Sequence, residues 1–200
     1  MTLAQLLIFI PAAFLVAMSP GANNLLAFSN GSRAGFGAAI RALAGRLVAF
    51  ALMIGLVAAG LGAVLATSKL AFTLIKWAGA AYLLWLAVRM WSAPVEQGAP
   101  PPVRMMRAEF LTAMSNPKAV LLFTAFLPQF VVGDTGISGQ LMALGVVYIA
   151  VEGAAAALWA GGGAWLGARA LSAARRKIID RAAALAMIGA AGLILRSERP

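Results

Sequence analysis

Residues 14–26 read FLVAMSPGANNLL, and residues 110–122 read FLTAMSNPKAVLL. Seven of the thirteen paired positions are identical, and each copy places proline and asparagine inside an otherwise apolar run. Proline removes a backbone hydrogen-bond donor and disrupts the preceding turn of a helix. In a membrane, the backbone groups freed by such a break must be buried in protein or line a polar cavity. Matching breaks in two halves of a chain indicate the binding site of a secondary transporter.

The composition indicates a multi-pass membrane protein. Of the 200 residues, 62% are hydrophobic and 11% are charged, whereas soluble domains have about half and about a quarter. Several apolar runs reach the roughly 18 residues that cross a bilayer core. The chain has no Cys and no His, which excludes a disulfide framework and the commonest metal ligands. We therefore expect no cofactor and no metal.

The fold class that follows is an all-α integral membrane protein with about six transmembrane helices, the first and fourth of them broken. The apolar runs that predict these spans cover residues 3–28, 38–66, 70–91, 108–132, 138–168 and 178–196. In the last of them only 14 residues separate Arg181 from Arg196, which is about 21 Å of helix. An arrangement with five spans is therefore the alternative.

Three spans in each half predict two inverted repeats. The first three-helix repeat covers residues 1–92, a Pro-rich cytoplasmic linker covers 93–107, and the second repeat covers 108–200. An odd number of spans reverses the second repeat relative to the first, so the two breaks are expected to face each other. The loops after spans one, three and five hold most of the Lys and Arg residues. By the positive-inside rule these loops are cytoplasmic, and both termini are periplasmic.

The two breaks supply the candidate substrate-binding residues, namely Ser19, Pro20, Gly21, Asn23, Asn24, Asn116, Pro117 and Lys118. Unwound carbonyls accept hydrogen bonds from an ammonium group, and the N-terminus of a half-helix attracts a carboxylate. A helix that restarts at Pro117 would add its dipole to the charge of Lys118. One alternative is a simple proline kink whose Asn side chains join helices. Another is that Lys118 reaches the membrane interface or only orders the loop.

Glu152 is interpreted as the only carboxylate deep inside a span, about halfway along residues 138–168. An ionised group at that depth costs on the order of 3 kcal/mol or more, so it normally has a partner or a function. We expect Glu152 to couple transport to an ion, with Arg46 or Arg41 of the second span as its partner. The alternative is a purely structural ion pair.

Small residues at helical spacing predict close helix packing. Gly31 with Gly35, and Gly163 with Gly167, each have the small-xxx-small spacing that lets two membrane helices approach.

Several motifs in the chain resemble one known family. They read SPGANNLL at 19–26, RAGF at 33–36, KWAGAAYLL at 76–84, NPKA at 116–119 and FLPQF at 126–130. In this order they resemble the LysE/RhtB family of bacterial amino-acid exporters, the homoserine/threonine/lysine efflux type. The resemblance implies an inner-membrane efflux carrier for amino acids or related metabolites, driven by proton exchange. The chain departs from the family pattern at Ala22, where a second proline is usual, and at Arg41, where a glycine is usual.

Two other functions remain open from the residues alone, a membrane-embedded accessory or scaffold subunit and an exporter of an inorganic cation. An enzyme is not expected, because the sequence offers neither a nucleophile–base set nor a phosphate-binding loop. The expected partners are a small-molecule substrate and the lipid bilayer, with a homo-oligomer left open. Nucleic acid is not expected, because the basic residues lie in short loops between apolar runs.

Overall fold

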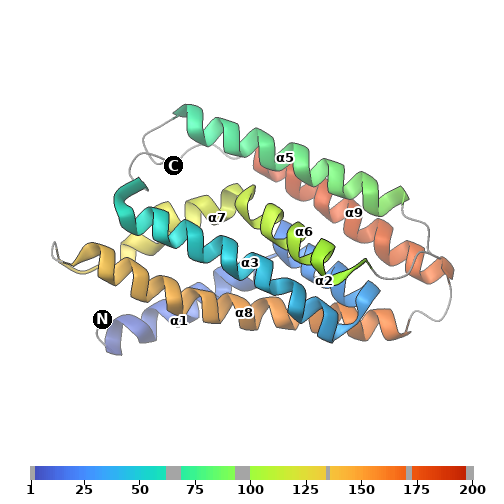
Figure 1. The fold of residues 1–200 in the computed structure, drawn as a ribbon, viewed down its shortest axis with the longest axis horizontal. Coiled ribbons are helices and arrows are strands. Elements are labelled where there is room, and N and C mark those ends of the chain that lie inside the picture. The colour runs from blue at the N-terminus through green and yellow to red at the C-terminus, as the bar shows by residue number, and fades with distance from the viewer. Residues whose placement is uncertain (1–2, 62–68, 93–99, 134–135, 170–172, 197–200) are drawn as a thin grey trace.

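In the computed structural model the chain is described over residues 3–61, 69–92, 100–133, 136–169 and 173–196. Within these ranges every regular element is a helix, as the sequence predicts. The helices lie side by side along one long axis (Figure 1).

Both predicted breaks are present. The first separates α1 (Leu3–Met18) from α2 (Ala22–Ala34), and the two helices are bent by 65°. The second separates α6 (Pro102–Met114) from α7 (Pro117–Leu121), and the bend between α6 and the segment Pro117–Phe130 is 56°. After α7 the chain continues as a π-helical turn, η2 (Leu122–Phe126), and a 3₁₀ turn, η3 (Leu127–Phe130). Each break lies at the predicted proline, which cannot donate to the turn before it.

The remaining helices are α3 (Phe36–Leu56) with the π-helical turn η1 (Val57–Leu61), α5 (Lys69–Ser92), α8 (Ile137–Arg169) and α9 (Ala173–Arg196). By length and composition two helices of the described chain can cross a membrane, over Phe36–Gly60 and Ile137–Arg169. If each bent pair is one span, the number rises to four. The other two expected spans correspond to α5 and α9, each 24 residues long.

The helix that precedes the second break begins earlier than the predicted span. It starts at Pro102, within the stretch expected as a linker and six residues before the predicted start at residue 108. Proline fits the first turn of a helix because its missing N–H would have no intrahelical partner there. Glu109 consequently lies two turns inside α6.

Glycine brings α2 and α8 into close contact. A Cβ atom added at Gly31, Gly163 or Gly167 would lie 2.0 to 2.3 Å from a backbone oxygen of the opposite helix. Only glycine permits this approach, which confirms the packing predicted for these three residues. Gly35 differs from the prediction, because a Cβ atom added there would meet nothing within 4 Å, and the residue instead turns the chain between α2 and α3 at φ +79°.

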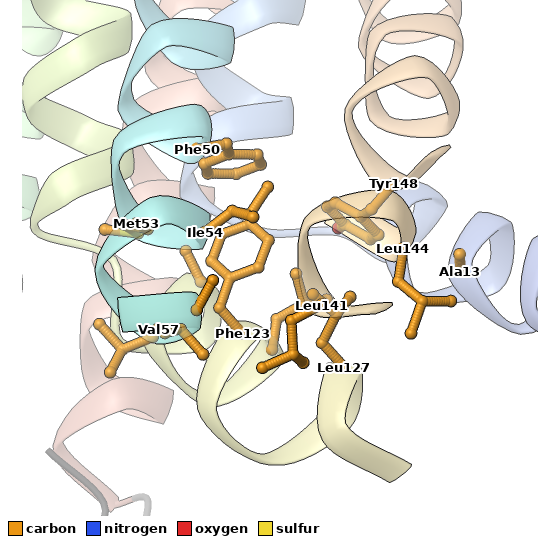
Figure 2. Close-up of a cluster of buried hydrophobic side chains, with 14 of the residues drawn as sticks. Ala13, Phe50, Met53, Ile54, Val57, Phe123, Leu127, Leu141, Leu144 and Tyr148 are labelled. Carbon is orange, nitrogen blue, oxygen red and sulfur yellow. The ribbon is translucent and has the colours of Figure 1, made fainter. Parts of the chain in front are cut away.

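An aromatic cluster lies beside the breaks, between α3, η2 and α8 (Figure 2). The ring of Phe123 meets those of Phe50 and Tyr148 edge-on, with centroid distances of 5.2 and 5.6 Å. All three side chains are buried. Their packing joins α3 and α8 to η2, which follows the second break.

Candidate functional site

The two breaks border a half-open cavity, whose empty volume of about 330 Å³ includes open solvent at its mouth. Its walls come from both breaks, from α3 and from α8. The lining residues are Ala17, Gly21, Asn23, Asn24, Phe50, Asn116, Lys118, Ala119, Leu122, Tyr148 and Glu152. The cavity therefore combines polar groups at the breaks with an apolar wall.

A direct contact joins the two breaks. Asn116 donates from Nδ2 to Oδ1 of Asn23 at 2.6 Å. Its own Oδ1 accepts from the backbone N–H of Lys118 at 3.0 Å, so Asn116 is also the N-cap of α7. Since a cap satisfies a donor that the helix leaves unpaired, one residue both starts α7 and holds it against the first break.

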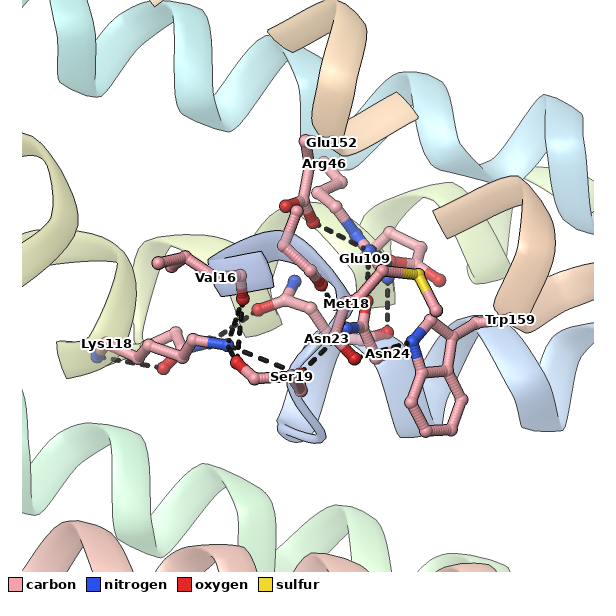
Figure 3. Close-up of polar contacts among 12 residues, drawn as sticks. Val16, Met18, Ser19, Asn23, Asn24, Arg46, Glu109, Lys118, Glu152 and Trp159 are labelled. Carbon is pink, nitrogen blue, oxygen red and sulfur yellow. Dashed lines mark hydrogen bonds and ion pairs between the residues drawn. The ribbon is translucent and has the colours of Figure 1, made fainter. Parts of the chain in front are cut away.

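Lys118 and Asn24 close the carbonyl end of α1. The Nζ atom of Lys118 lies 3.0 Å from Val16 O, 3.3 Å from Ser19 O and 2.5 Å from Ser19 Oγ. Asn24 donates from Nδ2 to Ala17 O at 2.6 Å and to Ser19 O at 3.0 Å. The last carbonyls of a helix lack intrahelical donors and favour a cation. Lys118 thus points to the first break and hydrogen-bonds to that loop (Figure 3).

A buried guanidinium lies behind the cavity. Arg46 of α3 is 0% exposed, and its Nε and Nη2 donate to Glu109 Oε2 at 3.0 and 2.8 Å. Its Nη1 donates to Glu152 Oε1 at 3.1 Å and to Asn24 Oδ1 at 3.2 Å, and Nη2 also donates to the carbonyl of Asn23. One cation therefore connects α2, α3, α6 and α8 (Figure 3).

Glu152 is not the only buried carboxylate, because α6 places Glu109 in the interior as well. Glu109 is 0% exposed and Glu152 is 4% exposed. Glu109 also accepts a hydrogen bond from Asn30 Nδ2 at 3.0 Å. The predicted span began at residue 108, which put Glu109 at a membrane boundary, whereas the helix begins at Pro102 and directs this carboxylate inward.

Of the two expected partners of Glu152, only Arg46 contacts it. Arg41 is exposed on α3. At 100° per residue, five positions place two side chains about 140° apart around a helix, so Arg41 and Arg46 cannot face the same neighbour. The second partner of Glu152 is Tyr148, whose hydroxyl donates to Oε2 at 3.0 Å.

Two buried polar atoms in the described part of the chain have no hydrogen-bond partner, Asn23 Nδ2 and Thr112 Oγ1. Asn23 lines the cavity and is 5% exposed. Beside it, Gly21 is the N-cap residue of α2, and no side chain caps this helix. An unpaired buried donor costs about 1–3 kcal/mol, which a ligand acceptor in the cavity would recover.

The predicted binding residues divide into two groups. Gly21, Asn23, Asn24, Asn116 and Lys118 line the cavity, together with Glu152, whereas Ser19, Pro20 and Pro117 shape the breaks without lining it.

The sequence reasoning missed the side chains of Phe50, Leu122 and Tyr148. Two of these could have been predicted from their spacing, because Phe50 follows Arg46 by four positions and Tyr148 precedes Glu152 by four. That spacing places residues on one face of a helix.

Among the described residues, no group of three or more His, Cys, Asp or Glu side chains gathers as a metal site would.

Comparison with known proteins gives a consistent result. The family model described as LysE type translocator matches residues 14–198. A homoserine/homoserine lactone efflux protein of Salmonella typhimurium is 30% identical over 149 residues, which are 69% of this chain and 70% of that protein. A cysteine/O-acetylserine efflux protein of Escherichia coli O157:H7 is 34% identical over 149 residues, 74% and 76% of the two chains. A leucine efflux protein of an Enterobacter species is 29% identical over 145 residues, 68% and 69% of the two chains. No solved structure matches the chain.

Proposed function

Because the chain belongs to the LysE type translocator family, we propose that it exports a small amino acid or related metabolite from the cytoplasm in exchange for protons. The similar proteins named above are efflux proteins for homoserine and its lactone, leucine, and cysteine or O-acetylserine. The observation that carries the proposal is the cavity at which both breaks meet. It holds a carboxylate, Glu152, and an unpaired donor on Asn23 in one small space.

A zwitterionic amino acid complements the polar groups of this cavity. Its ammonium group would lie at Glu152, beside the hydroxyl of Tyr148. Its carboxylate would accept from Asn23 Nδ2 and lie at the uncapped start of α2, where the helix dipole favours negative charge. The substrate side chain would contact Phe50, Ala119 and Leu122, which form the apolar part of the lining.

Proton coupling follows from competition for one carboxylate. Glu152 can hold a proton or pair with the substrate ammonium, and a protonated carboxyl no longer attracts a cation. Proton entry would therefore release substrate, and loss of the proton would reset the site for the next molecule. This exchange of one ligand for the other is antiport.

Alternating access would move the two halves against each other around the breaks. In this proposal α1–α2, α3 and α5 form the first repeat, and α6–α7, α8 and α9 form the inverted second repeat. The opposite directions of α1–α2 and α6–α7 along the long axis (Figure 1) support an inverted arrangement. We place the protein in the bacterial inner membrane with six spans and both termini in the periplasm, because the basic loops are then cytoplasmic.

The test is transport by the purified protein in proteoliposomes that contain a mixture of labelled amino acids, with an imposed pH gradient. Gradient-dependent loss of one or a few labels is the expected result, and Glu152→Gln should abolish the dependence on the gradient while the protein still folds. Normal coupled transport by Glu152→Gln would refute the role of Glu152. If the wild-type protein moves no label, a scaffold subunit or a cation exporter becomes the better assignment, and flux of inorganic cations through the same vesicles separates these two.

A further inference from the structure

We infer that the two buried carboxylates have different functions: Glu109 is the permanent counter-ion of Arg46, and its presence leaves Glu152 available to exchange a proton. The inference rests on the proposed function of Glu152 and adds Glu109 as a positioning residue, since Glu109 does not line the cavity.

The hydrogen bonds of the two carboxylates differ in number and kind. Glu109 accepts two N–H bonds from Arg46, at 2.8 and 3.0 Å, and one from Asn30 at 3.0 Å. Glu152 accepts one N–H bond from Arg46, at 3.1 Å, and one from the hydroxyl of Tyr148. Both Arg46 bonds end on Oε2 of Glu109, while Oε1 accepts from Asn30. Glu109 thus has three hydrogen bonds, two of them from a cation, and charge-assisted bonds are the stronger kind. Glu109 is therefore the more firmly held of the two.

The charge balance favours the same division. One guanidinium faces two carboxylates, so two ionised carboxylates would leave one excess negative charge in the buried cluster. Buried charges persist when they are paired and hydrogen-bonded. Because Arg46 and Glu109 neutralise each other, the excess belongs to Glu152, the carboxylate that lines the cavity.

No other described group replaces Arg46 beside Glu152. The charged and titratable groups that face it are Arg46 from α3, Lys118 from α7, Glu109 from α6 and Tyr148 from its own helix. The neighbouring side chains of α2, Asn23 and Asn24, are neutral. Lys118 lines the same cavity as Glu152, but its Nζ atom bonds to Val16 and Ser19 of the first break.

Because Glu109 stays paired with Arg46, Glu152 can change its charge without leaving Arg46 unpaired. When a proton or a substrate ammonium occupies Glu152, the guanidinium keeps its two bonds to Glu109. Without Glu109, Glu152 would be the only counter-ion of a fully buried arginine, and proton binding would have to compete with that ion pair. Glu109 should thus set the pH range over which Glu152 works.

The experiment compares wild-type protein with E109Q, E109D and the double variant R46Q/E109Q. The first readout is the pH at which transport is half-maximal in proteoliposomes. The second is an infrared titration of protonated carboxyl groups in the purified protein without substrate, with the Glu152 signal identified by its loss in E152Q. In E109Q both midpoints should move to lower pH by at least about one unit, which is tenfold weaker proton binding. E109D, which keeps the charge, should titrate like wild type, and R46Q/E109Q should return to the wild-type midpoint because the pair is removed together.

The outcomes separate this inference from the proposed function. If wild-type protein transports and E152Q is uncoupled, but E109Q keeps the wild-type midpoint, the inference is overturned and the function stands. A midpoint in R46Q/E109Q as low as that of E109Q also overturns it. If the wild-type protein transports no amino acid, the proposed function fails, and the infrared titration still decides the relation between Glu109 and Glu152.

Discussion

The side chain of Asn116 donates to that of Asn23 at 2.6 Å, across 93 residues of sequence. Each of these residues belongs to one of the two helix breaks, so the two interruptions of the fold are hydrogen-bonded to each other. The bond uses the Oδ1 atom of Asn23 and leaves its Nδ2 atom without a partner at the cavity. A ligand that accepts from Nδ2 would therefore contact a residue that both breaks share.

Asn23→Ala should weaken substrate binding, because it removes the donor proposed for the substrate carboxylate. A lost hydrogen bond to a charged group is worth about 1.5–3 kcal/mol, so the KM for export should rise at least about tenfold. The matched control is Asn24→Ala. Its Nδ2 atom donates to the carbonyls of Ala17 and Ser19 at the first break, and its Oδ1 atom accepts from Arg46. This change should therefore lower the melting temperature more than it raises KM. The reverse pattern would assign the substrate contact to Asn24.

Lys118→Met should destabilise the first break. The change leaves the oxygens of Val16 and Ser19 without their cationic donor, at a cost of about 1–3 kcal/mol. The melting temperature of the detergent-solubilised protein should fall, and Lys118→Arg should recover part of the loss because the charge at the end of α1 is kept. An unchanged melting temperature together with abolished transport would instead indicate direct contact between Lys118 and the substrate.

Gly163→Ala should separate α2 from α8. The new methyl carbon would lie 2.0 Å from the carbonyl oxygen of Phe28, so one helix must shift, which costs about 1–3 kcal/mol in a packed interior. The adjacent Gly162 is the control, because a Cβ added there meets nothing within 4 Å. Gly162→Ala should be neutral or stabilising, since alanine favours a helix by about 1 kcal/mol over glycine. Equal melting temperatures for the two variants would contradict the close packing of α2 and α8.

Leu122→Ala should broaden the range of exported side chains. Leu122 is buried and lines the apolar part of the cavity, so its truncation enlarges the space proposed for the substrate side chain. Competition assays should show export of bulkier amino acids relative to the wild-type substrate. Leu144→Ala truncates a buried leucine of the same hydrophobic cluster that does not line the cavity. It should lower the free energy of unfolding by a similar amount, about 2–5 kcal/mol, without changing selectivity. If both variants change selectivity in the same way, the substrate side chain does not bind beside Leu122.

The positions of the breaks were predictable because their cause is local. Proline removes a backbone donor, and both bends occur where it stands beside Gly21 or Asn116, whereas α1 continues through Pro11. The burial of Glu152 was also predictable from its neighbours in sequence, since a carboxylate in the middle of a long apolar run must face the interior. The close packing at Gly31, Gly163 and Gly167 followed from spacing alone.

The pairing of the polar groups was harder to predict. Arg41 and Arg46 were equivalent candidates in the sequence, and Glu109 lay at an expected boundary. The rotation of α3 and the early start of α6 at Pro102 brought Arg46 and Glu109 together. Lys118 likewise had three plausible orientations, and only the position of α1 beside the second break made the oxygens of Val16 and Ser19 its partners.

The sequence by itself determined that the chain is helical and apolar enough for a membrane, and where two of its helices break, because composition and proline act on each segment separately. The tertiary structure alone decided which carboxylate Arg46 holds firmly and which one lines the cavity. Ion pairs and hydrogen bonds require atoms within about 3 Å in a suitable direction. That distance depends on how each helix is rotated and how closely its neighbours approach, which the spacing of residues along one chain does not define.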